Sequence, residues 1–226
     1  MTYKAILFDC DGVLLDSEPL GCEALAQAIS AAGVPLTRAE AAQIFSGNGA
    51  DQSRAWMSDA GLDAKAVFAE ADRILFRMFD ANVPHVPGIE PVLWDFDVAM
   101  AVCSNSSIVR LEKSIMRTPL AMRFAGQVYS AEQVALAKPA PDLALFAANR
   151  LGVAPEEAIF IDDNIHGIRC ARDAGCLAVG FVGPSEHRPG HAERLLEAGA
   201  DHLVHGMAEF HDLLNDLSLP LFERTA

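Results

Sequence analysis

The chain has 226 residues, and its 31 acidic and 17 basic side chains give a formal net charge of −14. That balance argues against nucleic acids and anionic membranes as partners, because both require a basic surface. Hydrophobic residues make up 51% of the chain, which is enough for a packed core and excludes a disordered protein. The start of the chain lacks the pattern of a signal peptide, and no apolar run is long enough to cross a bilayer. We therefore expect a soluble, cytoplasmic protein.

A short apolar run at residues 3–8 is typical of a buried strand. Similar runs follow at 98–103, 158–161, 177–181 and 202–204, and helical patterns lie between the later runs, notably at 142–151 and 164–174. Strands that alternate with helices predict a parallel sheet covered by helices on both faces. The expected fold class is therefore α/β, with a Rossmann-like parallel sheet as its core.

The segment 15–86 breaks this pattern, because it contains no convincing strand. Thr37 and Glu40 have the spacing of a capping box, which predicts the start of one helix. Helices are expected at residues 19–32, 37–45, 51–60 and 64–79. The sequence thus predicts an all-helical domain at 15–86, inserted into a core domain made of 1–14 and 87–226.

Five cysteines form no Cys-x-x-Cys pair, so a disulfide framework is not expected. Cys10 and Cys103 lie beside residues of the motifs described below, and either could act as a nucleophile. The favoured interpretation is that they fill buried strands as small apolar side chains.

Pairs of aspartates follow two of the predicted strands. Asp9 and Asp11 come directly after the first strand, at the end where open α/β sheets place their ligands, and two carboxylates there can bind a hard cation. Asp162 and Asp163 follow a later buried strand, where adjacent carboxylates repel each other unless a cation neutralises them. A turn or helix N-cap is the alternative role, although a cap needs one acid rather than two. Oxygen ligands alone favour magnesium over zinc.

Four motifs in a fixed order give the chain its resemblance to the haloacid dehalogenase superfamily, in the branch of the phosphatases and β-phosphoglucomutases. The motifs are the segment 9–13, Ser104 within 101–105, Lys138 within 137–142, and the segment 159–164 followed by Gly167. Together they span nearly the whole chain, and the later part is most similar to sugar-phosphate phosphatases. The resemblance implies that 15–86 is a helical cap domain on a monomeric enzyme.

The resemblance also implies the role of each matching residue. Asp9 would be the nucleophile that forms an aspartyl-phosphate, and Asp11 would be the general acid and then the general base. Mg²⁺ would be bound by Asp9, the backbone carbonyl of Asp11, and Asp163, while Asp162 either binds the metal too or holds waters and Lys138. Ser104 and Lys138 complete the catalytic set. The residues expected to contact the phosphate are Cys10, Asp11, Ser104, Asn105 and Lys138.

The loop before the third cap helix lies where caps of this family reach the active site. Gly47, Asn48 and Arg54 are therefore candidates for substrate selection, although Arg54 could equally be a solvated helix residue. Another pair, His187 and His191, has the spacing of a zinc pair on a helix, but the Pro-Gly between them would break a helix. We expect these histidines to lie in a solvated loop.

The leading hypothesis is a Mg²⁺-dependent phosphatase for a small phosphorylated metabolite, a sugar phosphate or sugar-acid phosphate. A β-phosphoglucomutase-like enzyme is an alternative, but those mutases carry a histidine where this chain has Gly21 and an arginine where Ala50 or Asp51 falls. A dehalogenase proper does not use the second aspartate as acid and base, so Asp11 argues against it. A non-catalytic metabolite sensor on the same fold is a further alternative, although no motif residue is lost.

Overall fold

The structure is a computed structural model that describes residues 2–46 and 50–222. The chain divides into two compact units, one made of Met1–Asp16 with His85–Ala226 and the other of Ser17–Pro84. In the described ranges, no helix combines the length and the apolar character that a membrane crossing requires.

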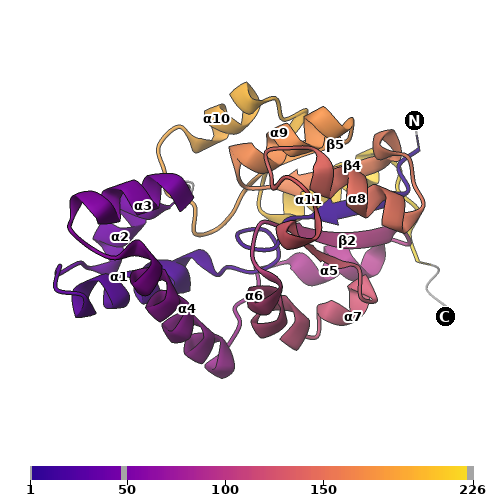
Figure 1. The fold of residues 1–226 in the computed structure, drawn as a ribbon. Coiled ribbons are helices and arrows are strands. Elements are labelled where there is room, and N and C mark those ends of the chain that lie inside the picture. Colours follow the sequence, from indigo (N-terminus) through magenta and orange to yellow (C-terminus); the bar gives the residue numbers. More distant parts are fainter. Residues whose placement is uncertain (1, 47–49, 223–226) are drawn as a thin grey trace. The chain divides into compact units, whose positions relative to one another are not determined.

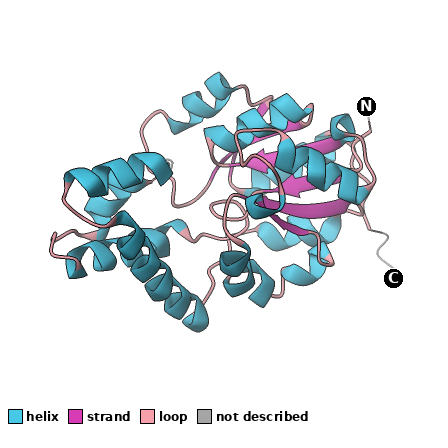
Figure 2. Ribbon diagram, in the orientation of Figure 1, coloured by secondary structure: helices cyan, strands magenta, loops and turns pink. Residues whose placement is uncertain are grey.

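A parallel sheet forms the centre of the larger unit (Figures 1 and 2). Among the described residues it has six strands, in the order β3-β2-β1-β4-β5-β6. The strands are β1 Ala5–Phe8, β2 Ala99–Ser104, β3 Val128–Ser130, β4 Ala158–Asp162, β5 Leu177–Val182 and β6 His202–His205. From β1 the chain builds the sheet in one direction through β2 and β3, and then places β4 on the other side of β1. In open α/β sheets, ligands bind beyond the carboxyl ends of the strands at such a reversal.

The prediction of a parallel α/β sheet is confirmed, and the predicted strands agree with the observed ones to within two residues at each end. The strand β3 was not predicted, because its three residues end on the polar Ser130 and do not form an apolar run.

Helices cover both faces of this sheet, so every residue of β1 is buried. On one face, Leu7 and Phe160 belong to a core with residues of α8, α9 and α10. On the other face, the ring of Phe8 makes edge-to-face contacts with Phe124 of α7 and Phe210 of α11, at centroid distances of 6.0 and 6.2 Å. The helices of this unit are α5 Ile89–Asp95, α6 Ile108–Lys113, α7 Ala121–Phe124, α8 Asp142–Leu151, α9 Ile165–Ala174, α10 His191–Ala198 and α11 Met207–Asp216, with 3₁₀ turns at Ile115–Arg117, Ala131–Gln133 and Pro155–Glu157.

Helices and the loops between them make up the described residues of the smaller unit, and Figure 2 shows strands only in the larger unit. Its helices are α1 Glu18–Ala31, α2 Arg38–Phe45, α3 Ala50–Asp59 and α4 Ala64–Ala81. Helix α1 packs against α2 and α4, around a core that includes Ile29, Met57 and Leu75. The capping box is confirmed: Thr37 Oγ1 accepts from the Glu40 amide at 3.3 Å, and the Thr37 amide donates to Glu40 Oε2 at 2.8 Å.

Candidate active site

Residues from four of the predicted motifs lie at one edge of the sheet, in the larger unit. The strands β2, β1 and β4 are parallel neighbours, so their carboxyl ends meet there. The residues are Asp9 and Asp11 after β1, Ser104 at the end of β2, Lys138 before α8, Asp162 at the end of β4, and Asp163.

Lys138 connects two of these carboxylates. Its Nζ atom lies 2.7 Å from Asp9 Oδ1 and 2.7 Å from Asp162 Oδ2, and only 4% of the lysine side chain is exposed. Burial alone would lower the pKa of Lys138, but the two carboxylates outweigh that effect and raise it, so the lysine stays charged. Burial raises the pKa of Asp9 to about 7, and the ammonium group of Lys138 opposes this rise.

Asp9, Asp162 and Asp163 form an acidic cluster that fits a divalent cation. One carboxylate oxygen from each of them lies within 4.8 Å of the other two. When ionised, these three groups carry more negative charge than the single ammonium of Lys138 can balance. A cation beside Asp9 would also counteract the rise in its pKa and keep it ionised. The donor atoms are all carboxylate oxygens, which suits Mg²⁺.

Asp162 and Asp163 differ in their surroundings, although they are adjacent. The two oxygens of Asp162 accept from Lys138 Nζ and, at 2.8 Å, from the amide of Asn164. Asp162 is therefore placed to hold Lys138, and direct metal contact by Asp163 stays a prediction.

Two glycines make room for these carboxylates. A Cβ atom on Gly167 would lie 1.7 Å from Asp162 Oδ2, and one on Gly12 would lie 2.5 Å from Asp163 Oδ2. Gly12 also has a φ of +88°, which side chains with a Cβ atom rarely adopt. Both positions therefore require glycine while the carboxylates keep their places.

Asp11 is held by two donors that the sequence interpretation missed. Ser106 Oγ donates to Asp11 Oδ2 at 2.8 Å, and Arg110 Nη2 of α6 donates to Asp11 Oδ1 at 3.1 Å. The amide of Ser106 also donates to Ser104 Oγ at 3.1 Å. Ser106 thus connects the predicted phosphate-binding serine with the predicted acid and base. The sequence signal that could have indicated Ser106 is the group of serines, Ser104, Ser106 and Ser107, at and after the end of β2.

Asn105 contacts the backbone of Lys138 at two points. Its Nδ2 atom donates to the Lys138 carbonyl, and its Oδ1 atom accepts from the Lys138 amide, both at 3.0 Å. The side-chain amide therefore fixes the loop that carries Lys138, and a contact between Asn105 and phosphate stays a prediction.

Cys10 and Cys103 are fully buried, and burial raises the pKa of both thiols well above the usual value. A thiol that resists ionisation is a poor nucleophile, which favours the packing role. No disulfide occurs, and the five cysteines, all among the described residues, are buried. A role for Cys10 in binding phosphate stays a prediction.

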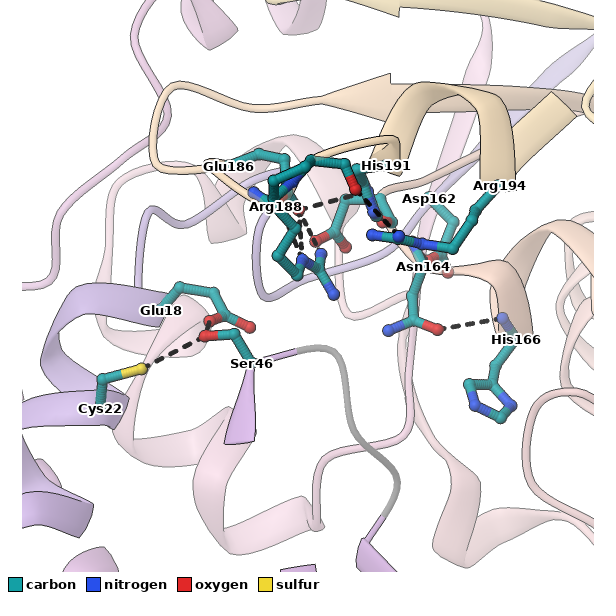
Figure 3. A network of polar contacts seen from close by, with 12 residues as sticks. Glu18, Cys22, Ser46, Asp162, Asn164, His166, Glu186, Arg188, His191 and Arg194 are labelled. Atoms are coloured by element: carbon teal, nitrogen blue, oxygen red, sulfur yellow. Dashed lines mark hydrogen bonds and ion pairs between the residues drawn. The ribbon is translucent and has the colours of Figure 1, made fainter. Parts of the chain in front are cut away.

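The expectation of a solvated loop is wrong for His191, although His187 is exposed. The sequence interpretation treated Pro189 and Gly190 as helix breakers, but they precede a helix: α10 begins at His191. The His191 ring is buried near Glu186 and Arg188 (Figure 3), and its Nε2 atom lies 2.8 Å from the carbonyl oxygen of Asp163. A buried histidine therefore adjoins the acidic cluster.

The candidates for substrate selection belong to the smaller unit. Gly47 and Asn48 lie outside the described residues. Arg54 lies on α3 with an exposed side chain. Their role stays a prediction.

Comparisons with known proteins agree with the motifs. A model of the haloacid dehalogenase-like hydrolase family matches residues 3–175. A phosphoglycolate phosphatase of Salmonella paratyphi A is 28% identical, over 96% of this chain and 93% of that protein. A haloacid dehalogenase-like protein of unknown function from Agrobacterium tumefaciens has a similar structure, with a TM-score of 0.81, 30% identity, and coverage of 96% of this chain and 98% of that one. A hydrolase of the same family from Deinococcus radiodurans, solved with bound phosphate and sodium, gives a TM-score of 0.81, 26% identity, and coverage of 96% and 97%.

The family match covers most of the chain, and phosphatases are among the relatives that align along nearly all of it. The chain therefore belongs to the haloacid dehalogenase-like hydrolase family, as an enzyme of the phosphoric monoester hydrolase class.

Proposed function

We propose that the enzyme is a Mg²⁺-dependent phosphatase that hydrolyses a small sugar phosphate or sugar-acid phosphate through an aspartyl-phosphate. The observation that carries this proposal is the buried contact of Lys138 with Asp9 and Asp162, beside the carboxylate of Asp163. The similarity to a phosphoglycolate phosphatase supports a small phosphorylated acid as one substrate class. The phosphate bound to the Deinococcus relative supports a phosphate site in this fold.

The cation would be held by Asp9, Asp163 and the Asp11 carbonyl, and when bound it would offset the repulsion between the nucleophile and a doubly charged phosphate. A carboxylate oxygen of Asp9 attacks phosphorus while the bond to the leaving oxygen breaks. Lys138 orients Asp9 and adds positive charge, and Ser104 offers a hydroxyl to the phosphoryl oxygens.

Proton transfer falls to Asp11. In the first half of the reaction it gives its proton to the leaving alkoxide, and in the second half it takes a proton from the attacking water. That water breaks the bond between phosphorus and Asp9, releases inorganic phosphate and restores the carboxylate. Ser106 and Arg110 set the position from which Asp11 acts.

The helical unit of Ser17–Pro84 would act as a cap that closes over the substrate and excludes bulk water. A closed cap leaves room only for small substrates, so phosphoproteins and nucleic acids should be poor ones.

The test is an assay of protein treated with EDTA and then dialysed, using a panel that includes phosphoglycolate, sugar phosphates and a phosphopeptide. We expect activity to return with added Mg²⁺ and the highest kcat/KM on a small metabolite. A phosphatase releases one inorganic phosphate for each substrate consumed, whereas a mutase returns an isomeric phosphate ester. Full activity in excess EDTA would contradict the metal dependence, and binding without turnover on every compound would favour the sensor.

A further inference from the structure

His191 is buried beside the acidic cluster of Asp9, Asp162 and Asp163, with 4% of its side chain exposed. Its Nε2 atom lies 2.8 Å from the backbone oxygen of Asp163. A carbonyl oxygen can only accept a hydrogen bond, so Nε2 carries the proton and donates it. The histidine comes from α10 and therefore joins a second element to the turn after β4.

The surroundings of the ring favour the same tautomer. Glu186 Oε2 lies 3.3 Å from His191 Nε2, and this negative charge beside Nε2 favours a proton on that nitrogen. Glu186 is held in turn by Arg188, whose Nε atom lies 2.9 Å from Oε1 and 2.8 Å from Oε2. Among the described residues, no group makes a hydrogen bond to Nδ1 of His191, which fits a ring nitrogen without a proton. The loop before α10 is thus built to hold this ring with Nε2–H toward Asp163.

The peptide group that receives this hydrogen bond joins Asp163 to Asn164. Its carbonyl accepts from His191, and its N–H donates to Asp162 Oδ1 at 2.8 Å. Asn164 Oδ1 then accepts from the amide of His166 at 3.1 Å and begins α9. A rotation of this one peptide would therefore disturb the carboxylate that holds Lys138 and the backbone that carries Asp163.

We propose that His191 is a positioning residue for the metal site: its Nε2–H fixes the Asp163–Asn164 peptide so that the Asp163 carboxylate faces Asp9. This inference rests on the proposed function, because it takes Asp163 as a metal ligand. Groups that orient metal ligands by hydrogen bonds change metal affinity or activity by about 10–100-fold when they are removed. The same range is expected here.

The test compares His191→Leu with His191→Gln. Leucine removes the donor, whereas the terminal amide of glutamine can donate to the same carbonyl. The readout is the binding of Mn²⁺ alone, measured by electron paramagnetic resonance, together with the Mg²⁺ concentration that gives half-maximal activity. We expect His191→Leu to lower the affinity for Mn²⁺, and to raise the Mg²⁺ concentration needed for half-maximal activity, by about 10–100-fold each. We expect His191→Gln to recover most of this loss.

His211→Leu is the matched control. This half-buried histidine of the same unit contacts Asp95 through Nε2 at 3.1 Å, and its ring packs at a tilt against the ring of Phe96. Its replacement should lower thermal stability without changing Mn²⁺ affinity. If His191→Leu does not fold, His191→Asn takes its place, because its amide is polar but too short to reach the carbonyl, and the same loss is expected.

The outcomes separate the two proposals. A wild-type protein that binds no Mn²⁺ and needs no metal would overturn the proposed function itself. A wild-type protein that binds Mn²⁺, with equal affinity in the His191→Leu or His191→Asn variant, would overturn only the role of His191. Equal losses in the leucine and glutamine variants would also contradict the hydrogen bond as the cause.

Discussion

Arg110 Nη2 lies 3.1 Å from Asp11 Oδ1, so an arginine from α6 holds the carboxylate proposed to move protons. Ser106 holds the other oxygen at 2.8 Å. With Arg110→Met, Asp11 loses one of these two contacts, and poor placement of a catalytic group costs up to about 100-fold in rate. We expect kcat to fall about 10–100-fold on an alkyl phosphate, with Mn²⁺ affinity unchanged. A Mn²⁺ affinity that falls in parallel with kcat would assign Arg110 to the metal site instead.

The variant Asp11→Asn tests proton transfer directly. The amide keeps the shape of the side chain but cannot donate and recover a proton, so kcat on an alkyl phosphate should fall about 10²–10⁴-fold. The loss should be smaller on p-nitrophenyl phosphate, since its leaving group needs little protonation. Equal losses on the two esters, with wild-type thermal melting, would contradict the acid–base role of Asp11.

Gly167→Ala should damage the site although alanine favours helices. A Cβ atom at this position would lie 1.7 Å from Asp162 Oδ2 and would displace the carboxylate that holds Lys138. We expect at least about a 10-fold loss of kcat, as for other displaced catalytic groups, and a lower Tm.

The control for this change is Gly21→Ala in α1. In the part of the chain that the structure describes, no atom outside the adjacent backbone of α1 lies within 4 Å of the added Cβ, so the substitution should stabilise the protein by up to about 1 kcal/mol. Steady-state kinetics and thermal melting measure both variants. Wild-type activity in Gly167→Ala would show that Asp162 can move without consequence.

Arg54→Ala tests whether the smaller unit selects the substrate. If Arg54 contacts the part of the metabolite beyond the phosphate, its loss should change the order of kcat/KM across the panel and have less effect on p-nitrophenyl phosphate. Arg77→Ala, which removes an exposed arginine of α4 in the same unit, is the control. Proportional losses on every substrate would exclude Arg54 as a selector.

The sequence predicts the parallel sheet and the catalytic motifs because short stretches of neighbouring residues are enough to indicate both. Asp9 follows an apolar run directly, and the same is true of Asp162, so their place at one edge follows from the parallel order of the strands. Lys138 is different: it lies in a loop, and only the resemblance to a family indicated its role.

The residues that support the site were missed because their partners lie far away in the sequence. Arg110 contacts a residue 99 positions earlier, and by itself an arginine on a short helix is typical of solvated surface. His191 was placed in a loop because the Pro-Gly before it was interpreted as a break, although Gly190, in the left-handed region, precedes α10. The strand β3 was missed because its three residues end on the polar Ser130 and do not form an apolar run.

The central claim is that the Asp9 carboxylate carries the phosphoryl group during turnover. The most direct measurement is a rapid acid quench of the enzyme with its best substrate and Mg²⁺, followed by mass spectrometry of the peptide that contains residue 9. We expect one phosphoryl group on Asp9 in the wild-type protein, and neither a phosphoryl group nor turnover in a folded Asp9→Asn variant. Wild-type turnover in Asp9→Asn, with no phosphoryl group found on Asp9 in the wild-type protein, would contradict it.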